Sequence, residues 1–227
     1  MGGRFRARLA PGPGLIVSLP RNDLALAEAA WDNGADALKV HLNVRHAAAG
    51  TAFGTWPQEQ PALTPIFENS PIPVGVMIGA ERVATEAEVQ ELTGLGMDFV
   101  DLYAHHAPDW LAGIAADRML AVDDSYDDEA VRAVVPRGAT LLEAAIVPHD
   151  QYGKPFAAAE LDRYGVLGEL TGLPVIVPTQ RALTPDDALR LVHEAGAAAL
   201  MIGIIVTGDT AASLGGATAR FRAALDS

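Results

Sequence analysis

The chain of 227 residues contains no cysteine, only two lysines, few aromatic side chains and no long hydrophobic run. Without cysteine it can form neither a disulfide framework nor a thiolate metal site. No apolar stretch approaches the roughly 20 residues that a membrane-spanning helix requires. Aromatic residues make up only 6% of the chain, so the core must be built from alanine, valine, leucine and isoleucine. Such a core suits helices packed on a parallel sheet.

Positive charge is also scarce. Sixteen basic residues stand against 29 acidic ones, which gives a formal net charge of −13. This balance argues against a nucleic-acid backbone or an anionic membrane as the partner. It does not exclude a small anionic ligand, because a local cradle of backbone N–H groups can oppose the overall field.

The amino-terminal residues differ from the rest of the chain. Residues 1–13 hold arginines but no apolar segment ahead of the short run 15–19, so we interpret them as an arm and not as a signal peptide. Residues 14–227 have the length of one barrel domain. A cytoplasmic location is the default expectation, and a homodimer stays open because no surface patch in the sequence marks an interface.

Short apolar runs alternate with longer segments of helical period along the whole chain, which predicts βαβ units around a parallel sheet. Glycine precedes four of these runs, where it ends a helix in the left-handed conformation. No Gly-x-Gly-x-x-Gly follows the first run, which disfavours an open nucleotide-binding sheet. We therefore predict the α/β class, as a single (β/α)8 TIM barrel. Its strands are expected at 14–19, 37–44, 74–79, 99–104, 119–123, 141–147, 175–179 and 200–204.

The longest irregular stretch is 45–70, which follows the second predicted strand and contains several prolines. We predict a loop there, because barrels place lids and substrate-binding elements after the carboxyl ends of their strands. A second candidate loop is 148–155. Helices are expected over 23–32, 85–93, 128–134, 158–170 and 185–195.

Polar residues alternate with aliphatic ones in the predicted strand 37–44, where Lys39, His41 and Asn43 share one face. Helices cover the outside of a barrel, so these polar side chains are predicted to point inside. Later strands add Asp101, Tyr103, Asp123 and Glu143. These side chains could form a buried, mutually satisfied network. Burying so many ionisable groups is costly unless they are used, so we predict that these seven residues form a catalytic cluster.

Lys39 is the first candidate of this cluster. Apolar neighbours would lower the pKa of its ammonium and make it a proton carrier or an amine nucleophile, whereas nearby carboxylates would raise that pKa. Glu143 and Asp101 are candidates for a complementary acid and base, as epimerisation by proton removal and return requires. Asn43, His41 and Tyr103 would orient hydroxyl groups or polarise a carbonyl.

A divalent metal is a second interpretation of the cluster. His41, His105 and Asp123 carry the imidazole and carboxylate groups that such an ion binds. No tight ligand motif is present, so we predict no metal and no other cofactor.

The last quarter of the chain carries its most specific motif. It reads LPVIVPTQRALTPDD from Leu173 and EAGAAALMIGIIVTGD from Glu194. This pattern resembles the seventh and eighth strand region of the phosphate-binding, or ribulose-phosphate-binding, (β/α)8 barrels, and most of all N-acetylmannosamine-6-phosphate 2-epimerase. The resemblance implies phosphate ligands at Thr179, Gln180, Arg181, Gly203 and Ile204.

Two features qualify the motif. The family usually has a glycine after the seventh strand, where this chain has Thr179-Gln180-Arg181. A hydroxyl, an amide and a guanidinium could still bind an anion there. The alternative explanation of Gly203 is close packing of a strand against a helix.

These observations predict an isomerase or epimerase that acts by proton transfer on a small phosphorylated substrate, such as a sugar phosphate. Two alternatives stay open. One is an aldolase or other lyase in which Lys39 forms a Schiff base. The other is a non-catalytic barrel that binds a phosphorylated metabolite, since the fold hosts many functions.

Overall fold

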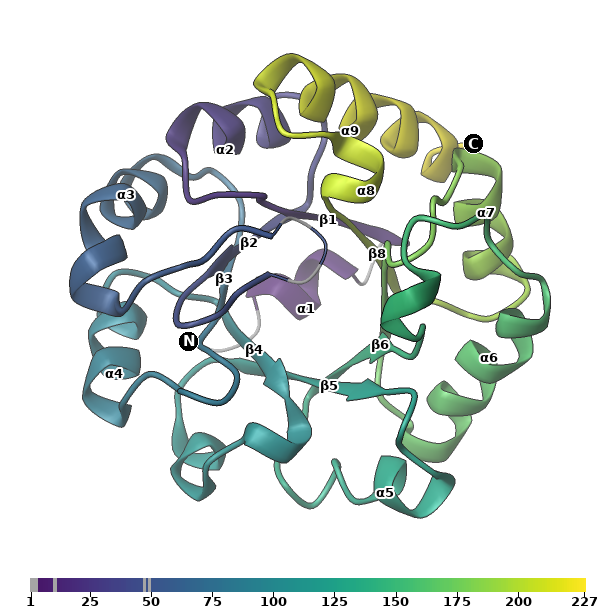
Figure 1. The fold of residues 1–227 in the computed structure, drawn as a ribbon, viewed down its shortest axis with the longest axis horizontal. Helices are drawn as coiled ribbons and strands as arrows, with labels where there is room; N and C mark the ends of the chain where they lie inside the picture. The colour runs from purple at the N-terminus through teal and green to yellow at the C-terminus, as the bar shows by residue number, and fades with distance from the viewer. Residues whose placement is uncertain (1–3, 10–11, 47, 49) are drawn as a thin grey trace.

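The computed structural model describes residues 4–9, 12–46, 48 and 50–227. Within them, eight parallel strands close into a barrel in chain order, with the last strand paired to the first (Figure 1). The predicted (β/α)8 barrel is confirmed, and each predicted strand overlaps an observed one. The strands are β1 (Gly14–Ser18), β2 (Ala37–His41), β3 (Val74–Met77), β4 (Phe99–Tyr103), β5 (Asp117–Asp123), β6 (Leu141–Ala145), β7 (Val175–Pro178) and β8 (Ala199–Ile202).

Helices surround the barrel on its outside (Figure 1). Between β4 and β5 the described chain forms only two 3-10 helices, η1 (Ala104–His106) and η2 (Asp109–Gly113). A third, η3 (His149–Gln151), follows β6. The α-helices are α1 (Arg4–Leu9), α2 (Leu24–Trp31), α3 (Trp56–Asn69), α4 (Glu86–Gly94), α5 (Asp128–Arg132), α6 (Ala159–Thr171), α7 (Pro185–His193), α8 (Ile204–Thr207) and α9 (Ala211–Leu225).

The prediction of a loop over 45–70 is wrong in its second half, because Trp56–Asn69 forms α3. Three prolines in this helix suggested a loop. One lies in the first turn, where its missing N–H needs no partner, and each of the other two removes one backbone hydrogen bond. Burial of Trp56, Leu63 and Ile66 against the barrel offsets that loss and keeps the segment helical.

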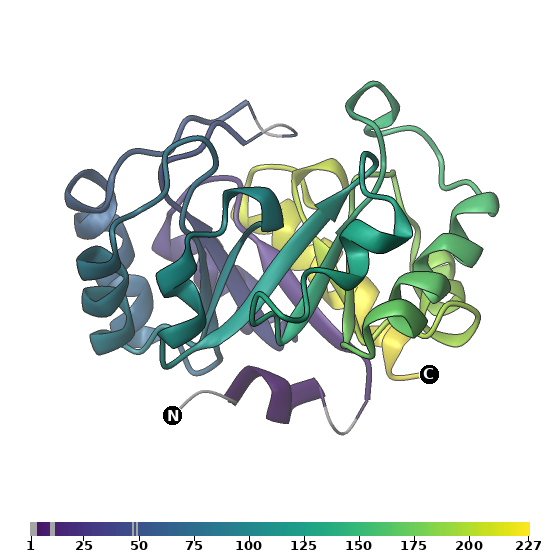
Figure 2. The same ribbon diagram turned by 90° about the horizontal axis from the view of Figure 1, so that it is seen from below.

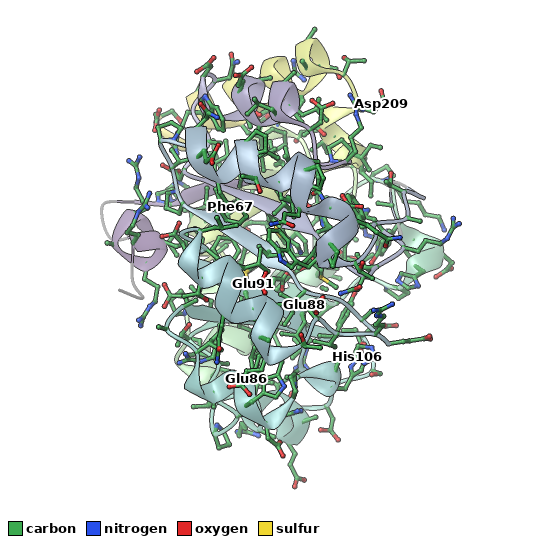
Figure 3. The ribbon with its side chains drawn as sticks, turned by 90° about the vertical axis from the view of Figure 1, so that its left-hand side faces the viewer. Phe67, Glu86, Glu88, Glu91, His106 and Asp209 are labelled. Carbon is green, nitrogen blue, oxygen red and sulfur yellow. The ribbon has the colours of Figure 1, made fainter. Side chains whose placement is uncertain are left out.

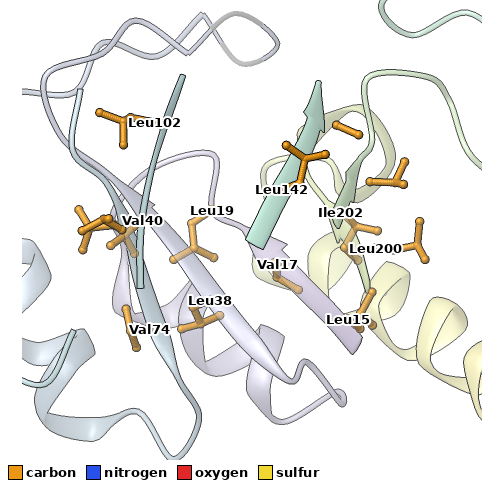
Figure 4. Packing of buried hydrophobic residues seen from close by; sticks show 14 of the residues in the cluster. Leu15, Val17, Leu19, Leu38, Val40, Val74, Leu102, Leu142, Leu200 and Ile202 are labelled. Carbon is orange, nitrogen blue, oxygen red and sulfur yellow. The ribbon is translucent and has the colours of Figure 1, made fainter. Parts of the chain in front are cut away.

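The core has two parts. An aliphatic layer lies between the sheet and the outer helices, and Figure 4 shows Leu38 and Val40 of β2 in it beside Val74 and Leu102. A smaller apolar layer fills the lower half of the barrel interior. Its members are Phe5, Ile16, Ala37, Phe99, Met119, Leu141, Ile176, Ala199 and Met201.

The amino-terminal arm closes the lower end of the barrel. Of its residues, 1–3 and 10–11 lie outside the described part of the chain, and Arg4–Leu9 forms α1 beneath the strands (Figure 2). Phe5 inserts into the barrel and stacks on Phe99, with ring centroids 4.6 Å apart. The upper half of the interior is therefore the part left for polar groups.

Gly75 on β3 makes room for the ring of Phe99. A Cβ atom at Gly75 would lie 2.0 Å from that ring, and the ring is already held by Phe5. We expect Gly75→Ala to lower the free energy of unfolding by about 1–3 kcal/mol, measured by urea denaturation.

Gly94→Ala is the matched control, because nothing lies within 4 Å of the added atom at the end of α4. It should leave stability unchanged or raise it by up to about 1 kcal/mol, since alanine favours a helix. Adding Phe99→Leu to Gly75→Ala should recover part of the loss. Equal stability of Gly75→Ala and the parent protein would contradict the close packing.

None of the helices formed by the described residues has both the length and the apolar character to cross a membrane.

Candidate functional site

A cavity of about 560 Å³ opens at the carboxyl ends of the strands, above the apolar lower layer. Each of the eight strands contributes at least one residue to its lining. His106, which also lines it, lies at the end of the barrel opposite α1 (Figure 3). The predicted site residues that line the cavity are Lys39, His41, Asp101, Tyr103, Asp123, Glu143, Thr179, Gln180, Gly203 and Ile204.

Lys39, Asp101 and Glu143 meet on the floor of this cavity. They come from β2, β4 and β6, and alternate strands of an eight-stranded barrel fill one interior layer together. Lys39 Nζ forms an ion pair with Asp101 and lies 3.1 Å from Glu143 Oε2. All three residues are at most 7% exposed. The strand geometry thus brings one ammonium and two carboxyl groups into direct contact.

Burial would lower the pKa of Lys39, but the charges of Asp101 and Glu143 outweigh it and hold that pKa above its ordinary value. Burial raises the pKa of Asp101 well above its usual range, and Glu143 raises it further against the opposing charge of Lys39. At neutral pH Lys39 is therefore an ammonium, while burial favours the protonated form of Asp101.

Tyr103 and Asp123 lie above this floor. Burial raises the pKa of the Tyr103 phenol, which stays a neutral donor, and its ring stacks on His105 with centroids 5.5 Å apart. Asp123 Oδ1 accepts hydrogen bonds from the backbone N–H and the hydroxyl of Ser125, at 2.9 and 2.5 Å. Both side chains are thus held in place before any ligand binds.

His41 occupies the β2 side of the cavity. Its Nε2 lies 3.4 Å from the hydroxyl oxygen of Ser18, and its ring stacks on Phe53 at 4.7 Å. The ring of His46 contacts the His41 ring edge-on, with centroids 5.0 Å apart. Burial lowers the pKa of His41 well below its ordinary value and lowers that of His46 to about 4. Both imidazoles are therefore neutral at pH 7.

The three residues considered as metal ligands have separate partners. His105 Nδ1 lies 3.1 Å from the hydroxyl of Tyr126, and the partners of His41 and Asp123 are those given above. In the part of the chain that the structure describes, no three His, Asp or Glu side chains are grouped to hold a metal ion.

The end of β8 joins the cavity to α8. The backbone N–H of Gly203 donates to Thr179 Oγ1 at 2.8 Å, so this N–H is already used, and the Thr179 hydroxyl proton is left to donate elsewhere. The N–H groups of Ile204 and Ile205 lie in the first turn of α8, where a helix offers them no acceptor.

Gly203 itself is not required by packing. A Cβ atom there would meet nothing closer than Ser18, at 3.7 Å, which is an ordinary contact. Its backbone is extended with a negative φ, so any residue could adopt it. Close packing of strand against helix, the alternative explanation of this glycine, is therefore wrong.

Gln180 and Arg181 serve the fold at the end of β7. Gln180 Oε1 accepts from Val147 N at 3.0 Å, and its Nε2 donates to Ala145 O at 3.1 Å. Arg181 does not line the cavity, because its guanidinium pairs with the half-buried Glu160. Neither group is free for a phosphate, contrary to the expectation from the resemblance.

Asn43 also does not line the cavity. β2 ends at His41, so the alternation that predicted an inward Asn43 no longer applies. Asn43 adopts a positive φ of 53°, and its side-chain amide donates to Ile78 O at 3.3 Å.

Ser18, His46 and Tyr152 also line the cavity. Sequence reasoning missed Ser18, although it shares the inward face of β1 with Ile16 by the same period-two rule. His46 and Tyr152 lie in the two candidate loops, 45–70 and 148–155, where no periodicity shows which residues point inward. The Tyr152 hydroxyl oxygen accepts a hydrogen bond from Gln180 Nε2 at 2.6 Å.

Comparison with known proteins finds no matching family model and no matching curated protein. Solved structures do match over nearly the whole chain. Tryptophan synthase from Mycobacterium tuberculosis is 16% identical, with 99% of both chains covered and a TM-score of 0.76. The tryptophan synthase A-subunit from Pyrococcus furiosus is 12% identical, with 92% of this chain and 97% of that chain covered and a TM-score of 0.66.

Phosphoribosylanthranilate isomerase from Thermotoga maritima is 10% identical, with 94% of this chain and 98% of that chain covered and a TM-score of 0.65. Structural matches at identities this low show a common fold and no more. The resemblance to the epimerase stays a prediction from the sequence.

Proposed function

We propose that this chain is an enzyme that transfers a proton next to a carbonyl group in a small phosphorylated substrate, as an isomerase or a lyase. The observation that carries the proposal is the buried cluster of Lys39, Asp101 and Glu143 on the cavity floor. An acid, a base and a fixed cation stand together there, and each has a part in such a reaction.

In the proposed step, the Glu143 carboxylate takes a proton from the carbon next to the carbonyl. The electrons of the broken C–H bond form a C=C bond, and the carbonyl oxygen becomes an enolate oxygen that the Lys39 ammonium stabilises. Asp101 then returns a proton to the same carbon, so that the C=C electrons form the new C–H bond and the C=O bond is restored. The cluster ends with the same net charge and one proton moved between its carboxyl groups.

The proposed phosphate position is the amino end of α8. The N–H groups of Ile204 and Ile205 and the hydroxyl proton of Thr179 are donors there, and Gly203 leaves room beside them. Phosphoribosylanthranilate isomerase, one of the similar structures, is by its name an isomerase with a phosphorylated substrate. That parallel in fold supports the proposal by analogy only.

A Schiff-base reaction at Lys39 is the less favoured chemistry. It needs a neutral amine, and the two carboxyl groups hold the pKa of Lys39 above its ordinary value. Borohydride treatment in the presence of substrate is therefore expected to leave no adduct on Lys39.

The proposal is tested in two stages. A thermal-shift screen against phosphorylated metabolites, with inorganic phosphate and sulfate as controls, identifies ligands. A ligand at 100 times its dissociation constant should add about 2.7 kcal/mol of stability. Each ligand is then incubated with the protein in D₂O, and mass spectrometry follows deuterium entering the carbon next to the carbonyl.

Glu143→Gln is expected to lower the exchange rate about 10²- to 10⁴-fold, the usual contribution of a general base. Glu194→Gln, on the exposed face of α7, removes the same charge far from the cavity and should leave the rate unchanged. Gly203→Leu should abolish the stabilisation by phosphorylated ligands. Binding without exchange would point to the non-catalytic barrel, and a borohydride adduct on Lys39 would point to the lyase.

A further inference from the structure

We infer that Ser18 and His41 form a second substrate-binding element, which recognises a hydroxyl group between the reacting carbon and the phosphate of the substrate. The inference rests on the proposed function, because it takes the phosphate at α8 and the reaction at Lys39 as given. It adds two residues and a chemical requirement on the substrate.

Ser18 stands between the two parts of the proposed site. Its strand, β1, pairs with β2 on one side and β8 on the other, and Ser18 is the register partner of Lys39. On the β8 side, a Cβ atom at Gly203 would lie 3.7 Å from the Cβ of Ser18. A molecule that reaches from Lys39 to the amino end of α8 therefore passes the Ser18 side chain.

His41 belongs to the same position. Both side chains line the cavity and are buried, with exposed fractions of 7% for Ser18 and 1% for His41. The distance of 3.4 Å between Ser18 Oγ and His41 Nε2 is long for a hydrogen bond between these atoms. Such contacts are often loose without ligand and tighten once a ligand is bound.

The His41 ring has little else to bind. Its Nδ1 is buried and has no hydrogen-bond partner among the residues that the structure describes. Stacking on Phe53 and the edge contact with His46 hold the ring in place without using either nitrogen. A neutral imidazole next to a serine hydroxyl can both accept and donate a hydrogen bond.

A substrate hydroxyl complements this pair because it too is both a donor and an acceptor. A methylene group at the same place would offer no hydrogen bond to the buried serine hydroxyl and imidazole. A site built to bind a hydroxyl rejects an analogue that lacks it far more strongly than an apolar pocket rejects an added group. The substrate class is therefore a phosphate ester with a hydroxyl on the carbon next to the phosphate-bearing one.

Two ligands that differ in that single hydroxyl test the inference. They are glycerol 3-phosphate and 3-hydroxypropyl phosphate, titrated into the protein by calorimetry, with inorganic phosphate as a third probe. The wild type is expected to bind glycerol 3-phosphate about tenfold more tightly than its deoxy analogue. Ser18→Ala should reduce this ratio of affinities to within about twofold, because it weakens the binding of the hydroxylated ligand only.

His41→Phe is the second variant, because it keeps a ring against Phe53 and removes both nitrogens. It should lower the same ratio. Ser70→Ala, which removes a hydroxyl at the far end of α3, should leave the ratio at its wild-type value. A general loss of structure would weaken the binding of both ligands equally. The ratio of the two affinities therefore distinguishes a loss of hydroxyl recognition from a loss of folding.

Equal binding of the two esters by the wild type would overturn the inference and leave the proposed function standing. A tenfold preference that persists in both Ser18→Ala and His41→Phe would also overturn it. If the wild type binds neither ester nor inorganic phosphate, the proposed function fails and the inference fails with it.

Discussion

Phe5→Ala is expected to lower the free energy of unfolding by about 3–5 kcal/mol, the usual cost of deleting a buried aromatic side chain. Phe5 is 0% exposed and closes the lower end of the barrel from a helix outside the sheet. Alanine there would remove the stack on Phe99 and leave a cavity at the axis. The measurement is urea denaturation followed by circular dichroism.

The loss at Phe5 should exceed that at an ordinary phenylalanine. Phe67 on α3 is half-buried against the outer aliphatic layer, so Phe67→Ala is the matched control with a smaller expected loss. Arg6 also ties α1 to the barrel, with its Nε 2.6 Å from the buried Asp117. If Phe5→Ala costs no more than Phe67→Ala, α1 does not contribute to the core as its packing implies.

The sequence predicts the fold because the fold depends on patterns that any barrel must satisfy. Apolar runs of strand length alternate with helical segments, and the helix expected from 185 begins there, where Thr184 and Asp187 form a capping box. The error at α3 arose because proline signals are local, whereas the burial of Trp56 against the barrel is a tertiary effect. In α3, tertiary packing therefore outweighs the low helix propensity of proline.

The site is predictable only as far as the strands extend. Period two places Lys39 and Asp101 inside, and the alternate-strand rule explains why they meet Glu143. Beyond the strand ends the same reasoning fails. Asn43 turns away two residues after β2 ends, and Arg181 pairs with the carboxylate of Glu160 on α6.

The charge state of Lys39 was also beyond the sequence. Burial and neighbouring carboxylates shift its pKa in opposite directions, and only the distances decide which effect prevails. In the structure Lys39 contacts both Asp101 and Glu143. The effect of its charge on the stability of the protein can therefore be tested by removing the ammonium.

Lys39→Met is expected to lower the free energy of unfolding by about 3–5 kcal/mol near pH 8, because it leaves buried carboxyl groups without their cation. Methionine has a similar length, so packing is largely kept. Adding Glu143→Gln to Lys39→Met should restore much of the loss, since only one buried carboxyl group, Asp101, would then remain without the cation. The measurement is urea denaturation of the three proteins at one pH.

The deficit of Lys39→Met should shrink as the pH falls from about 8 to about 5. Burial raises the pKa of Asp101, and the Lys39 ammonium opposes that shift, so removing the ammonium lets the folded variant take up a proton that the unfolded chain still lacks. A group that binds protons more tightly when folded adds stability on acidification, by about 1.4 kcal/mol per pH unit for each proton. In the wild type Lys39 holds the pKa of Asp101 lower, so the wild type gains less.

The buried histidines act in the same direction as the carboxyl groups. As the pH falls, His41 and His46 cost both proteins stability, because burial and in part the Lys39 ammonium lower their folded pKa values. Lys39→Met reduces this cost in the variant, which also shrinks the deficit on acidification. The other lysine of the chain, Lys154, is exposed, so Lys154→Met should show a small and constant difference at every pH. A deficit of Lys39→Met that stays constant, or grows on acidification, would mean that Lys39 does not oppose the raised pKa of Asp101.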